Sequence, residues 1–487
     1  MKSAIDLLQF LFLKLMALNL MVELLNAHKS EYFTNDVIQA LETIAPGRVS
    51  LSDDVRAQHG KDMSYHEGAP PDAVVFAENT EEVSAIVKLC AEKSVPLIPF
   101  GAGTSLEGHV AALQGGISLD LSAMNNIVAV HADDLNITVE AGVTRKQVNH
   151  HLRDTGLFFP IDPGADATIG GMTATRASGT NAVRYGTMRE NVMALTVVMA
   201  DGRIIRTGSR AKKSSAGYDL THLYVGSEGT LGVITEITLR LYGIPDAISA
   251  AVCSYATLEG AINTVISTIQ CGIPVARIEL LDEAQIDAVN RYSNLDYPVK
   301  PTLFFEFHGT LGSVKEQSEL VDELSKDNAG TDFCWATKAE DRSRLWQARH
   351  DAFLAVLAMR PGYQGVVSDV CVPISRLADC ILETRKDIDE TGLYAPIVGH
   401  VGDGNFHLAT MINPNDLVQL AAAKTLNDRL VARALEMGGT CTGEHGVGYG
   451  KLDYMKAEHG EALDVMRALK KALDPGNIMN PGKIVRL

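Results

Sequence analysis

Two hydrophobic periods alternate along most of the chain, one typical of strands and the other typical of helices. In the first half, short apolar runs bounded by turn residues predict strands at 73–77, 95–100, 116–121, 137–141, 195–199, 204–207 and 233–241. Apolar residues three and four apart predict helices with Asn35 and Thr80 as N-caps, and a third helix at 144–155. Residues 162–187, rich in Gly, Ala, Ser and Thr, predict a loop longer than a simple connection. The pattern therefore predicts an α+β domain that ends near residue 243.

The second half continues the alternation to about residue 450. Helices are expected at 256–271, 313–327, 375–391 and 415–437. Strands are expected at 249–254, 276–281, 302–309 and 396–401. No internal repeat is visible, so the pattern predicts a second, different α+β domain.

The composition is that of a folded protein with large cores and an acidic surface. Of the 487 residues, 46% are apolar and 21% charged, and the formal net charge is -17 with a pI near 5.3. Such a surface repels nucleic acid, which argues against a nucleic-acid partner, and it also repels an anionic substrate. A site for a carboxylate must therefore supply positive charge from Arg, Lys or a metal. The seven cysteines form no close pair, which indicates a reducing compartment and an expected cytoplasmic location.

Residues 7–25 form an apolar segment that Lys14 and Glu23 interrupt. The segment falls short of the ~20 clean apolar residues that a spanning helix needs, and no cleavage site of a secretory signal follows it. We expect an amphipathic surface helix, or a translation start placed too early, with Met21 as another start. Peripheral contact with the inner membrane is the alternative.

A glycine-rich segment follows the strand expected at 95–100. It spans residues 101–108 (GAGTSLEG) and leads into another strand, whereas a Rossmann dinucleotide loop must open a helix. A Walker loop is excluded because no Gly-Lys-Ser/Thr follows. Successive backbone N–H groups without bulky side chains can still form a concave phosphate site. A glycine-rich hairpin without a ligand is the alternative.

Two later segments of small residues, 163–187 and 226–235, favour a ligand. Glycine loses the most conformational entropy on folding, so three such loops in one domain are costly as structure alone. A long, flat ligand that lies against the backbone explains all three together.

In this order the three loops resemble the FAD domain of the vanillyl alcohol oxidase and p-cresol methylhydroxylase superfamily. Residues 99–109 match its pyrophosphate loop. The resemblance implies that 163–187 pass the isoalloxazine and ribityl parts of FAD, and that 226–235 contact the adenine half or the pyrophosphate. The cofactor-binding residues expected from it are Pro99, Gly101, Ala102, Gly103, Thr104, Ser105, Leu106, Gly108, His109, Pro163, Gly164, Thr168, Gly170, Gly171, Thr173, Ala177, Ser178, Gly179, Asn181, Arg184, Tyr185, Gly186, Glu228, Gly229, Gly232 and Ile234.

His109 lies near the end of this pyrophosphate loop and is the obvious candidate for a covalent link to the flavin. Some members of the superfamily attach FAD through a His or a Cys. The members that this chain resembles most have Gly at this place, so non-covalent FAD is expected.

Two histidines and a glutamate form a second candidate site. His400 and His407 flank a Gly-Asp-Gly-Asn turn, so both can lie on one side of it. Glu444 follows in the segment Gly-Glu-His-Gly at 443–446. Three such ligands with open positions suit a catalytic divalent metal, Zn²⁺ or Mn²⁺. Two core histidines in a turn are the alternative, and Asp403 is interpreted as a turn residue only.

Two further residues add chemistry beside this set. His445 is adjacent to a proposed ligand and is expected to point elsewhere, and its unperturbed pKa of about 6.5 suits a general base. A structural hydrogen bond is the alternative role. Arg349 is expected on a helix, and its guanidinium can bind a carboxylate through two hydrogen bonds. Without the metal site, a solvated arginine would be the default interpretation.

The C-terminal half resembles the cytochrome-linked D-lactate dehydrogenases. The similarity runs from about residue 35 to the end and rests on the segments 277–283, 345–350, 368–373, 400–407, 442–451 and 473–483. It implies an α+β substrate and metal-binding cap domain with a ferredoxin-like sheet, next to a p-cresol methylhydroxylase-type FAD domain of two α/β subdomains. The organisation expected is an N-terminal helical segment, the FAD domain, the cap, and a C-terminal segment packing back on the FAD domain, with bounds 1–66, 67–245, 246–455 and 456–487.

Three apolar positions argue for a monocarboxylate. Relatives that oxidise D-2-hydroxyglutarate hold its second carboxylate with a Lys, an Asn and a Thr at the places of Val367, Ala409 and Phe353. An apolar pocket does not offset the desolvation of a second carboxylate. The expected substrate is D-lactate or another short D-2-hydroxy acid.

The resemblance also implies a mechanism. The metal binds the substrate hydroxyl, Arg349 fixes the carboxylate, and His445 takes the hydroxyl proton while a hydride leaves C2 for flavin N5. Cytochrome c or a quinone then accepts the electrons. The catalytic subunit of a glycolate dehydrogenase is an alternative, and a non-catalytic FAD-binding subunit of a complex is an alternative of another class.

Overall fold

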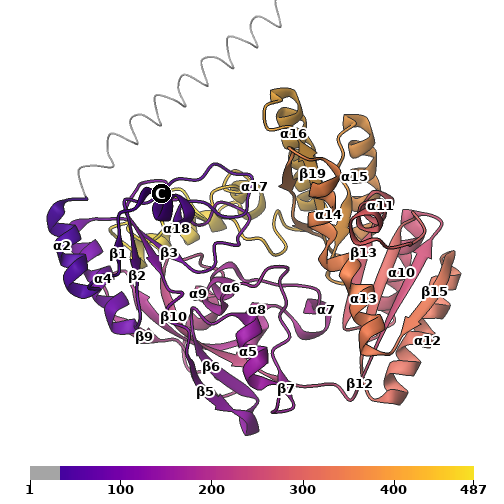
Figure 1. Cartoon of the computed structure of the whole chain (residues 1–487), viewed down its shortest axis with the longest axis horizontal. Helices are drawn as coiled ribbons and strands as arrows, with labels where there is room; N and C mark the ends of the chain where they lie inside the picture. Colours follow the sequence, from indigo (N-terminus) through magenta and orange to yellow (C-terminus); the bar gives the residue numbers. More distant parts are fainter. Residues whose placement is uncertain (1–32) are drawn as a thin grey trace, which may run out of the picture.

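The computed structural model describes residues 33–487, so the apolar segment 7–25 lies outside the described residues. Figure 1 shows two bodies side by side, the first in indigo and magenta and the second in pink and orange. The yellow C-terminal segment returns to the first body. Both bodies combine helices with sheets, which confirms the α+β class.

The first body contains a four-stranded sheet with the order β1-β2-β4-β3. Its strands are β1 (Val49–Ser50), β2 (Ala73–Phe76), β3 (Leu97–Phe100) and β4 (Ile117–Asp120), and the helices around it are α2 (Asn35–Ile44), α3 (Asp53–His59) and α4 (Thr80–Lys93). β3 and β4 are parallel neighbours, yet no helix joins them. The glycine-rich segment makes this connection, which confirms that it does not open a helix.

Both expected helix caps in this region are wrong by one residue. Asn35 and Thr80 are the first helical residues of α2 and α4, and the caps are Thr34 and Asn79. Asn79 has extended backbone, and its side chain accepts a hydrogen bond from Glu82 N at 2.9 Å. A cap must lie outside the helical backbone to reach this N–H, so the earlier polar residue takes the position.

A five-stranded antiparallel sheet with the order β5-β6-β10-β8-β9 completes the first body. The strands are β5 (Ile127–His131), β6 (Asn136–Glu140), β8 (Val192–Met199), β9 (Ile204–Arg206) and β10 (Gly232–Arg240). The short strands β7 (Leu157–Phe158) and β11 (Tyr242–Gly243) pair beside it, and the helices are α5 (Arg145–Leu152), α6 (Ile169–Thr175), α7 (Ala182–Tyr185), α8 (Met188–Asn191) and α9 (Leu220–Tyr224).

The segment 162–187 is therefore only partly a loop, since α6 and α7 lie inside it. Thr168 caps α6, accepting a hydrogen bond from Gly171 N. The buried side chains of Ile169 and Met172 pack in the first core. A cap and tertiary packing thus override the low helix propensity of Gly and Thr.

The second body is built on a sheet whose main path is β15-β12-β14-β13-β18-β19-β16. Its strands are β12 (Ala247–Tyr255), β13 (Arg277–Leu281), β14 (Thr302–Gly309), β15 (Gly330–Ala336), β16 (Gln364–Val367), β17 (Val370–Cys371), β18 (Ile397–Gly399) and β19 (Asn405–Ile412). The sequence pattern missed β15, β16, β17 and β19. The last of these is buried along its whole length, so it shows no alternation of polar and apolar burial.

Helices cover both faces of this sheet. One core includes α10 (Leu258–Gln270), α12 (Leu311–Asp327), α15 (Leu377–Thr391) and α16 (Leu417–Glu436), and the core on the other face includes α11 (Glu283–Ser293), α13 (Ala339–His350) and α14 (Ala352–Met359). Successive residues of β12 point into different cores, as the strand period requires: Ala251 into the first and Val252 into the second.

The chain ends against the first body. After α17 (Met455–His459) and α18 (Ala462–Leu473), Leu97 N donates a hydrogen bond to Ile478 O at 2.8 Å, and Asn480 N donates one to Leu97 O at 2.9 Å. Ile478 and Met479 belong to the first core. Among residues 33–487, no helix is long and apolar enough to cross a membrane.

Candidate active site

A cavity of about 830 Å³ has walls from both bodies. From the second body come all five residues that the sequence predicted for catalysis and metal binding: Arg349, His400, His407, Glu444 and His445. From the first body come most of the predicted cofactor residues: Pro99, Gly101, Ala102, Gly103, Thr104, Ser105, Leu106, His109, Pro163, Gly164, Thr168, Gly170, Gly171, Ala177, Ser178, Glu228, Gly229, Gly232 and Ile234. One cavity therefore brings the two candidate sites together.

The glycine-rich loop presents unused donors to this cavity. Within the described chain, the backbone N–H groups of residues 101–106 donate no hydrogen bond to the protein. The Asp62 carboxylate anchors the loop by accepting hydrogen bonds from Ser105 Oγ at 3.1 Å and His109 N at 3.0 Å. Gly103 has a φ of +64°, which favours glycine. Because orphan N–H groups need acceptors, the loop fits a pyrophosphate.

The second small-residue segment lies directly against this loop. A Cβ on Gly101 would lie 2.4 Å from Thr168 Oγ1, so glycine is needed for the close approach. Two cationic side chains of the first body that sequence reasoning missed, those of Arg145 and Lys146, also line the cavity, as does Arg277 of the second body. Together these features fit a dinucleotide that lies along the backbone of the first body.

Seven of the predicted cofactor residues do not line the cavity: Gly108, Thr173, Gly179, Asn181, Arg184, Tyr185 and Gly186. Three of them join the two bodies instead. Asn181 Oδ1 accepts a hydrogen bond from Arg277 Nε at 2.9 Å, the Tyr185 hydroxyl lies 2.8 Å from His308 Nδ1, and Arg184 donates to Pro274 O. Contact between these seven residues and the cofactor stays a prediction.

The three proposed metal ligands converge on one point. β18 and β19 are antiparallel, and the turn between them places His400 and His407 side by side, as the spacing predicted. Glu444 Oε1 lies 3.1 Å from His400 Nε2 and 3.3 Å from His407 Nε2. The other ring nitrogens donate outward, His400 Nδ1 to Glu279 Oε1 at 2.7 Å and His407 Nδ1 to Ser368 O at 3.1 Å. Both Nε2 atoms therefore remain as ligand atoms on the side of Glu444, which fits a divalent metal.

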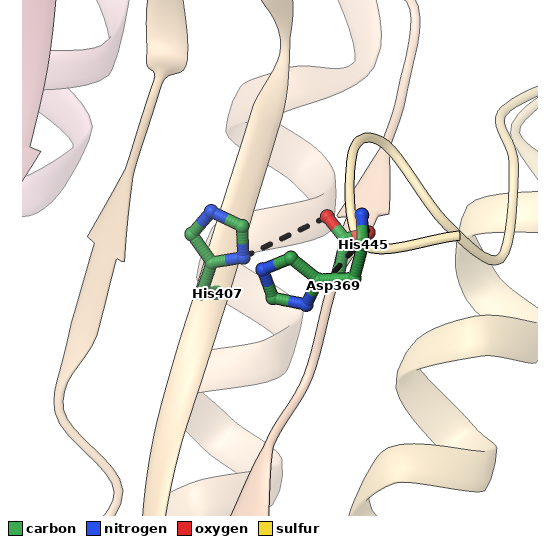
Figure 2. Close-up of side chains that lie close together, drawn as sticks. All are labelled: Asp369, His407 and His445. Carbon is green, nitrogen blue, oxygen red and sulfur yellow. Dashed lines mark hydrogen bonds and ion pairs between the residues drawn. The ribbon is translucent and has the colours of Figure 1, made fainter. Parts of the chain in front are cut away.

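A second cluster, Asp369 with His407 and His445, lies beside this set (Figure 2). Asp369 is buried, and its carboxylate accepts from Asn405 Nδ2, Thr442 Oγ1, Glu444 N and His445 N at 2.7 to 3.0 Å. Three of these donors bind Oδ2 and one binds Oδ1, so the carboxylate fits the role of an anchor for the loop. Nearby His445, Lys451 and His407 hold its pKa well below the usual range despite burial.

His445 is not one of the three proposed ligands, His400, His407 and Glu444, which are called the ligand set below, but it lies close to them. Its ring stacks on that of His407, with centroids 4.9 Å apart; Figure 2 shows the two side chains next to each other. Nε2 is 3.9 Å from Glu444 Oε1, and Nδ1 is 4.0 Å from Asp369 Oδ2. Burial lowers the pKa of His445, so the neutral imidazole, which is the form that accepts a proton, is favoured.

Arg349 projects from α13 toward the same space. Its Nε donates to Glu279 Oε2 at 2.6 Å, while within the described chain its two terminal amino groups have no hydrogen-bond partner. The same cavity is lined by the apolar side chains of Val367 and Ala409, which are cross-strand partners, and of Phe353. The geometry thus offers a free cationic fork and an apolar wall to the substrate.

The loop that carries Glu444 and His445 is held by both bodies. Glu228, from the first body, accepts hydrogen bonds from Val447 N at 2.7 Å and Gly448 N at 2.8 Å. His109 Nε2 also lies near this carboxylate, 3.4 Å from Glu228 Oε2. Glu228 was predicted only as a cofactor contact, and its hold on this loop was missed because the partners are more than 200 residues apart.

Comparison with known proteins gives two family matches. Residues 71–208 match a family described as FAD binding domain, and residues 244–484 match FAD linked oxidases, C-terminal domain. A probable mitochondrial D-lactate dehydrogenase of Danio rerio is 54% identical over 90% of this chain and 89% of its own. A mitochondrial D-lactate dehydrogenase (cytochrome) of Arabidopsis thaliana is 47% identical over 94% of this chain and 82% of its own.

A solved structure shares the fold at much lower identity. p-Cresol methylhydroxylase with substrate bound has a TM-score of 0.74 and 17% identity, covering 92% of this chain and 96% of its own. The likeness confirms the expected α+β fold of the p-cresol methylhydroxylase type.

Proposed function

The chain belongs to the FAD-linked oxidases, and from this membership we propose that it is a dehydrogenase that oxidises D-lactate, or another short D-2-hydroxy monocarboxylic acid, to the 2-oxo acid. It is an oxidoreductase that binds FAD. The observation that carries the substrate proposal is the meeting, in one cavity, of a free guanidinium fork, an imidazole and an apolar wall at Arg349, His445 and Val367. The names of the two D-lactate dehydrogenase relatives support the same substrate.

Each group of the site has a part in this reaction. When bound, FAD supplies the acceptor for the hydrogen and electron pair that leave C2, and a divalent Zn²⁺ or Mn²⁺ held by His400, His407 and Glu444 supplies positive charge that lowers the pKa of the hydroxyl. Arg349 binds the substrate carboxylate through its two terminal amino groups. His445 accepts the hydroxyl proton at Nε2, the ring nitrogen on the side of Glu444. Asp369, 4.0 Å from Nδ1, then stabilises the imidazolium.

The central test is anaerobic addition of D-lactate to the purified protein while the flavin absorbance is recorded. We expect the flavin to bleach. A flavin that no 2-hydroxy acid bleaches would support the alternative of a non-catalytic FAD-binding subunit.

Substrate length is a second test. D-lactate should exceed D-2-hydroxyglutarate in kcat/KM by about 100-fold or more, because Val367, Phe353 and Ala409 give the far carboxylate no partner. The double change Val367→Lys with Ala409→Asn should narrow this ratio, since it places an amino group and an amide at two paired positions. Steady-state rates with a dye acceptor measure both, with L-lactate as the control that should stay poor. A wild-type preference for D-2-hydroxyglutarate would contradict the pocket assignment.

A third test concerns how FAD is attached to the protein. We expect acid or heat denaturation to release the flavin into the filtrate, because the superfamily members that this chain resembles most have Gly at the place of His109. Flavin that stays on the denatured chain, and is lost from it in a His109→Gln variant, would instead assign His109 as a covalent attachment site.

The acceptor of the electrons follows from the same relatives. One of them is named as a cytochrome-linked enzyme, and we propose cytochrome c, with a quinone as the alternative. Mixing the anaerobically reduced protein with each acceptor in a stopped-flow instrument distinguishes them. The cytoplasmic or inner-membrane location expected from the sequence stays a prediction, while both relatives are named as mitochondrial proteins.

A further inference from the structure

One buried carboxylate touches both halves of the catalytic machinery. Glu279 lies on β13, in the interior of the sheet of the second body, and is fully buried. Its Oε1 accepts a hydrogen bond from His400 Nδ1 at 2.7 Å, and its Oε2 accepts one from Arg349 Nε at 2.6 Å. Each oxygen thus serves a different functional residue, one in the ligand set and one in the proposed substrate anchor.

The contact with His400 determines which ring nitrogen is free. A metal-binding imidazole is neutral and carries one N–H, and the acceptor at Nδ1 would keep that hydrogen there, which leaves Nε2, the atom facing Glu444, to bind the metal. His407 is oriented differently, by the backbone carbonyl of Ser368. His407 Nδ1 also lies 3.6 Å from Asp369 Oδ1, but only for His400 is the hydrogen bond at Nδ1 made to a side chain, that of Glu279.

The contact with Arg349 determines how the guanidinium faces the cavity. The guanidinium is planar, so fixing Nε also fixes the plane of the two terminal amino groups. These groups are the donors left for a substrate carboxylate. Because both contacts are made by one rigid carboxylate group, the distance and angle between the anchor and the ligand are set together.

We propose that Glu279 is a positioning residue that holds the metal ligand His400 and the substrate anchor Arg349 in one frame, so that its loss weakens metal binding and carboxylate binding together. This inference rests on the proposed function. If Glu279 only neutralised Arg349, its loss would weaken carboxylate binding alone. If Glu279 had a purely structural role, its loss would weaken neither metal binding nor carboxylate binding specifically.

Glu279→Gln tests the proposal with nearly unchanged shape. The amide has one acceptor and one donor, so it cannot accept from both His400 Nδ1 and Arg349 Nε. If the amide donates to His400 Nδ1, the ring hydrogen moves to Nε2, the atom that faces Glu444. Either arrangement leaves one of the two functional residues misoriented.

Glu306 offers a matched control. It is also a buried glutamate between a histidine and an arginine, and it lies on the neighbouring strand β14. Its Oε1 lies 2.9 Å from His308 Nε2 and 3.4 Å from Arg277 Nε. Those partners join the two bodies and belong to neither the ligand set nor the anchor. Glu306→Gln therefore removes the same kind of charge without the two contacts in question.

The experiment uses FAD-loaded protein stripped of metal by a chelator. Zn²⁺ affinity is measured by competition with a chromophoric chelator, and affinity for propionate, a carboxylate without a 2-hydroxyl, by the change in flavin absorbance at saturating Zn²⁺. For Glu279→Gln we expect a Zn²⁺ Kd raised roughly 10- to 100-fold and a propionate Kd raised on the order of tenfold. Glu306→Gln should leave both constants near those of the wild type.

A Glu279→Gln protein with wild-type affinity for either probe would overturn the inference. If this variant does not fold with FAD, Glu279→Asp replaces it: the shorter carboxylate keeps the charge but cannot span both partners, so either Kd at its wild-type value would overturn the inference as well. Wild-type protein that binds no Zn²⁺ would overturn the proposed metal site itself, an outcome distinct from a failure at Glu279 alone.

Discussion

Replacing His445 with alanine is expected to slow the reduction of bound flavin by D-lactate by roughly 10²–10⁴-fold, the range typical for loss of a general base. The imidazole lies beside the proposed ligands with 11% of its side chain exposed, and burial lowers its pKa, so the wild-type ring is in the neutral form that accepts a proton. Among the described residues, His445 is the one whose ring stacks in parallel on a proposed metal ligand, His407. His350 of α13 also lines the cavity but has no such stacking contact. Anaerobic stopped-flow measurement of flavin reduction gives the rate directly.

Metal content is the control for this variant. The ligand atoms His400 Nε2, His407 Nε2 and Glu444 Oε1 remain in place without His445, so bound metal should stay near the wild-type level. His445 is, however, also part of the second cluster with Asp369 and His407. If the variant loses its metal, that second cluster is the true ligand set, and the proton acceptor must be another group.

The sequence predicted the parts of the site that are local. The loop 101–108 was recognised as different from a Rossmann loop because a strand follows it, and the unused N–H groups of 101–106 agree with that interpretation. His400 and His407 were paired correctly because the turn between them is short and polar. In both cases the decisive information lies within about ten residues.

The residues that hold these parts in place could not be predicted in the same way. Glu279 and its partner His400 are 121 residues apart in the sequence, and Glu228 and its partner Gly448 are 220 residues apart. A buried glutamate in an apolar strand gives no periodic signal of its own, and only the folded chain identifies its partners. The same reason explains the missed contribution of Asn480, whose side chain donates to Glu228 O from near the C-terminus.

Asp369 shows how a long-range contact changes the meaning of a local motif. The segment Gly-Glu-His-Gly at 443–446 predicts a ligand next to a base, but adjacent residues need a rigid backbone to keep different directions. Asp369 supplies it by accepting hydrogen bonds from both Glu444 N and His445 N through Oδ2. Glu228 fixes the next turn of the same loop from the first body. The loop is therefore positioned by carboxylates from both sides of the cavity.

Replacing Glu444 with alanine should have the largest effect on the metal. Three ligands become two and the negative charge of the set disappears, since Glu444 Oε1 is the atom that faces both His400 Nε2 and His407 Nε2. After buffer exchange we expect almost no bound Zn²⁺ or Mn²⁺ by elemental analysis, FAD retained at the wild-type level, and activity that excess metal partly restores. FAD should remain because its predicted contacts lie in the first body.

Asp403→Asn is the matched control for this experiment. Asp403 is an acidic residue in the turn between the two histidines, three positions after His400, but it lies outside the candidate ligand clusters of residues 33–487. Loss of its charge should leave the metal content unchanged, whereas loss of Glu444 removes a ligand. If the Asp403 variant loses metal while the Glu444 variant keeps it, the third ligand comes from the turn and not from the loop at 443–446. Full activity of wild-type protein freed of metal by a chelator would instead contradict any catalytic role for the metal.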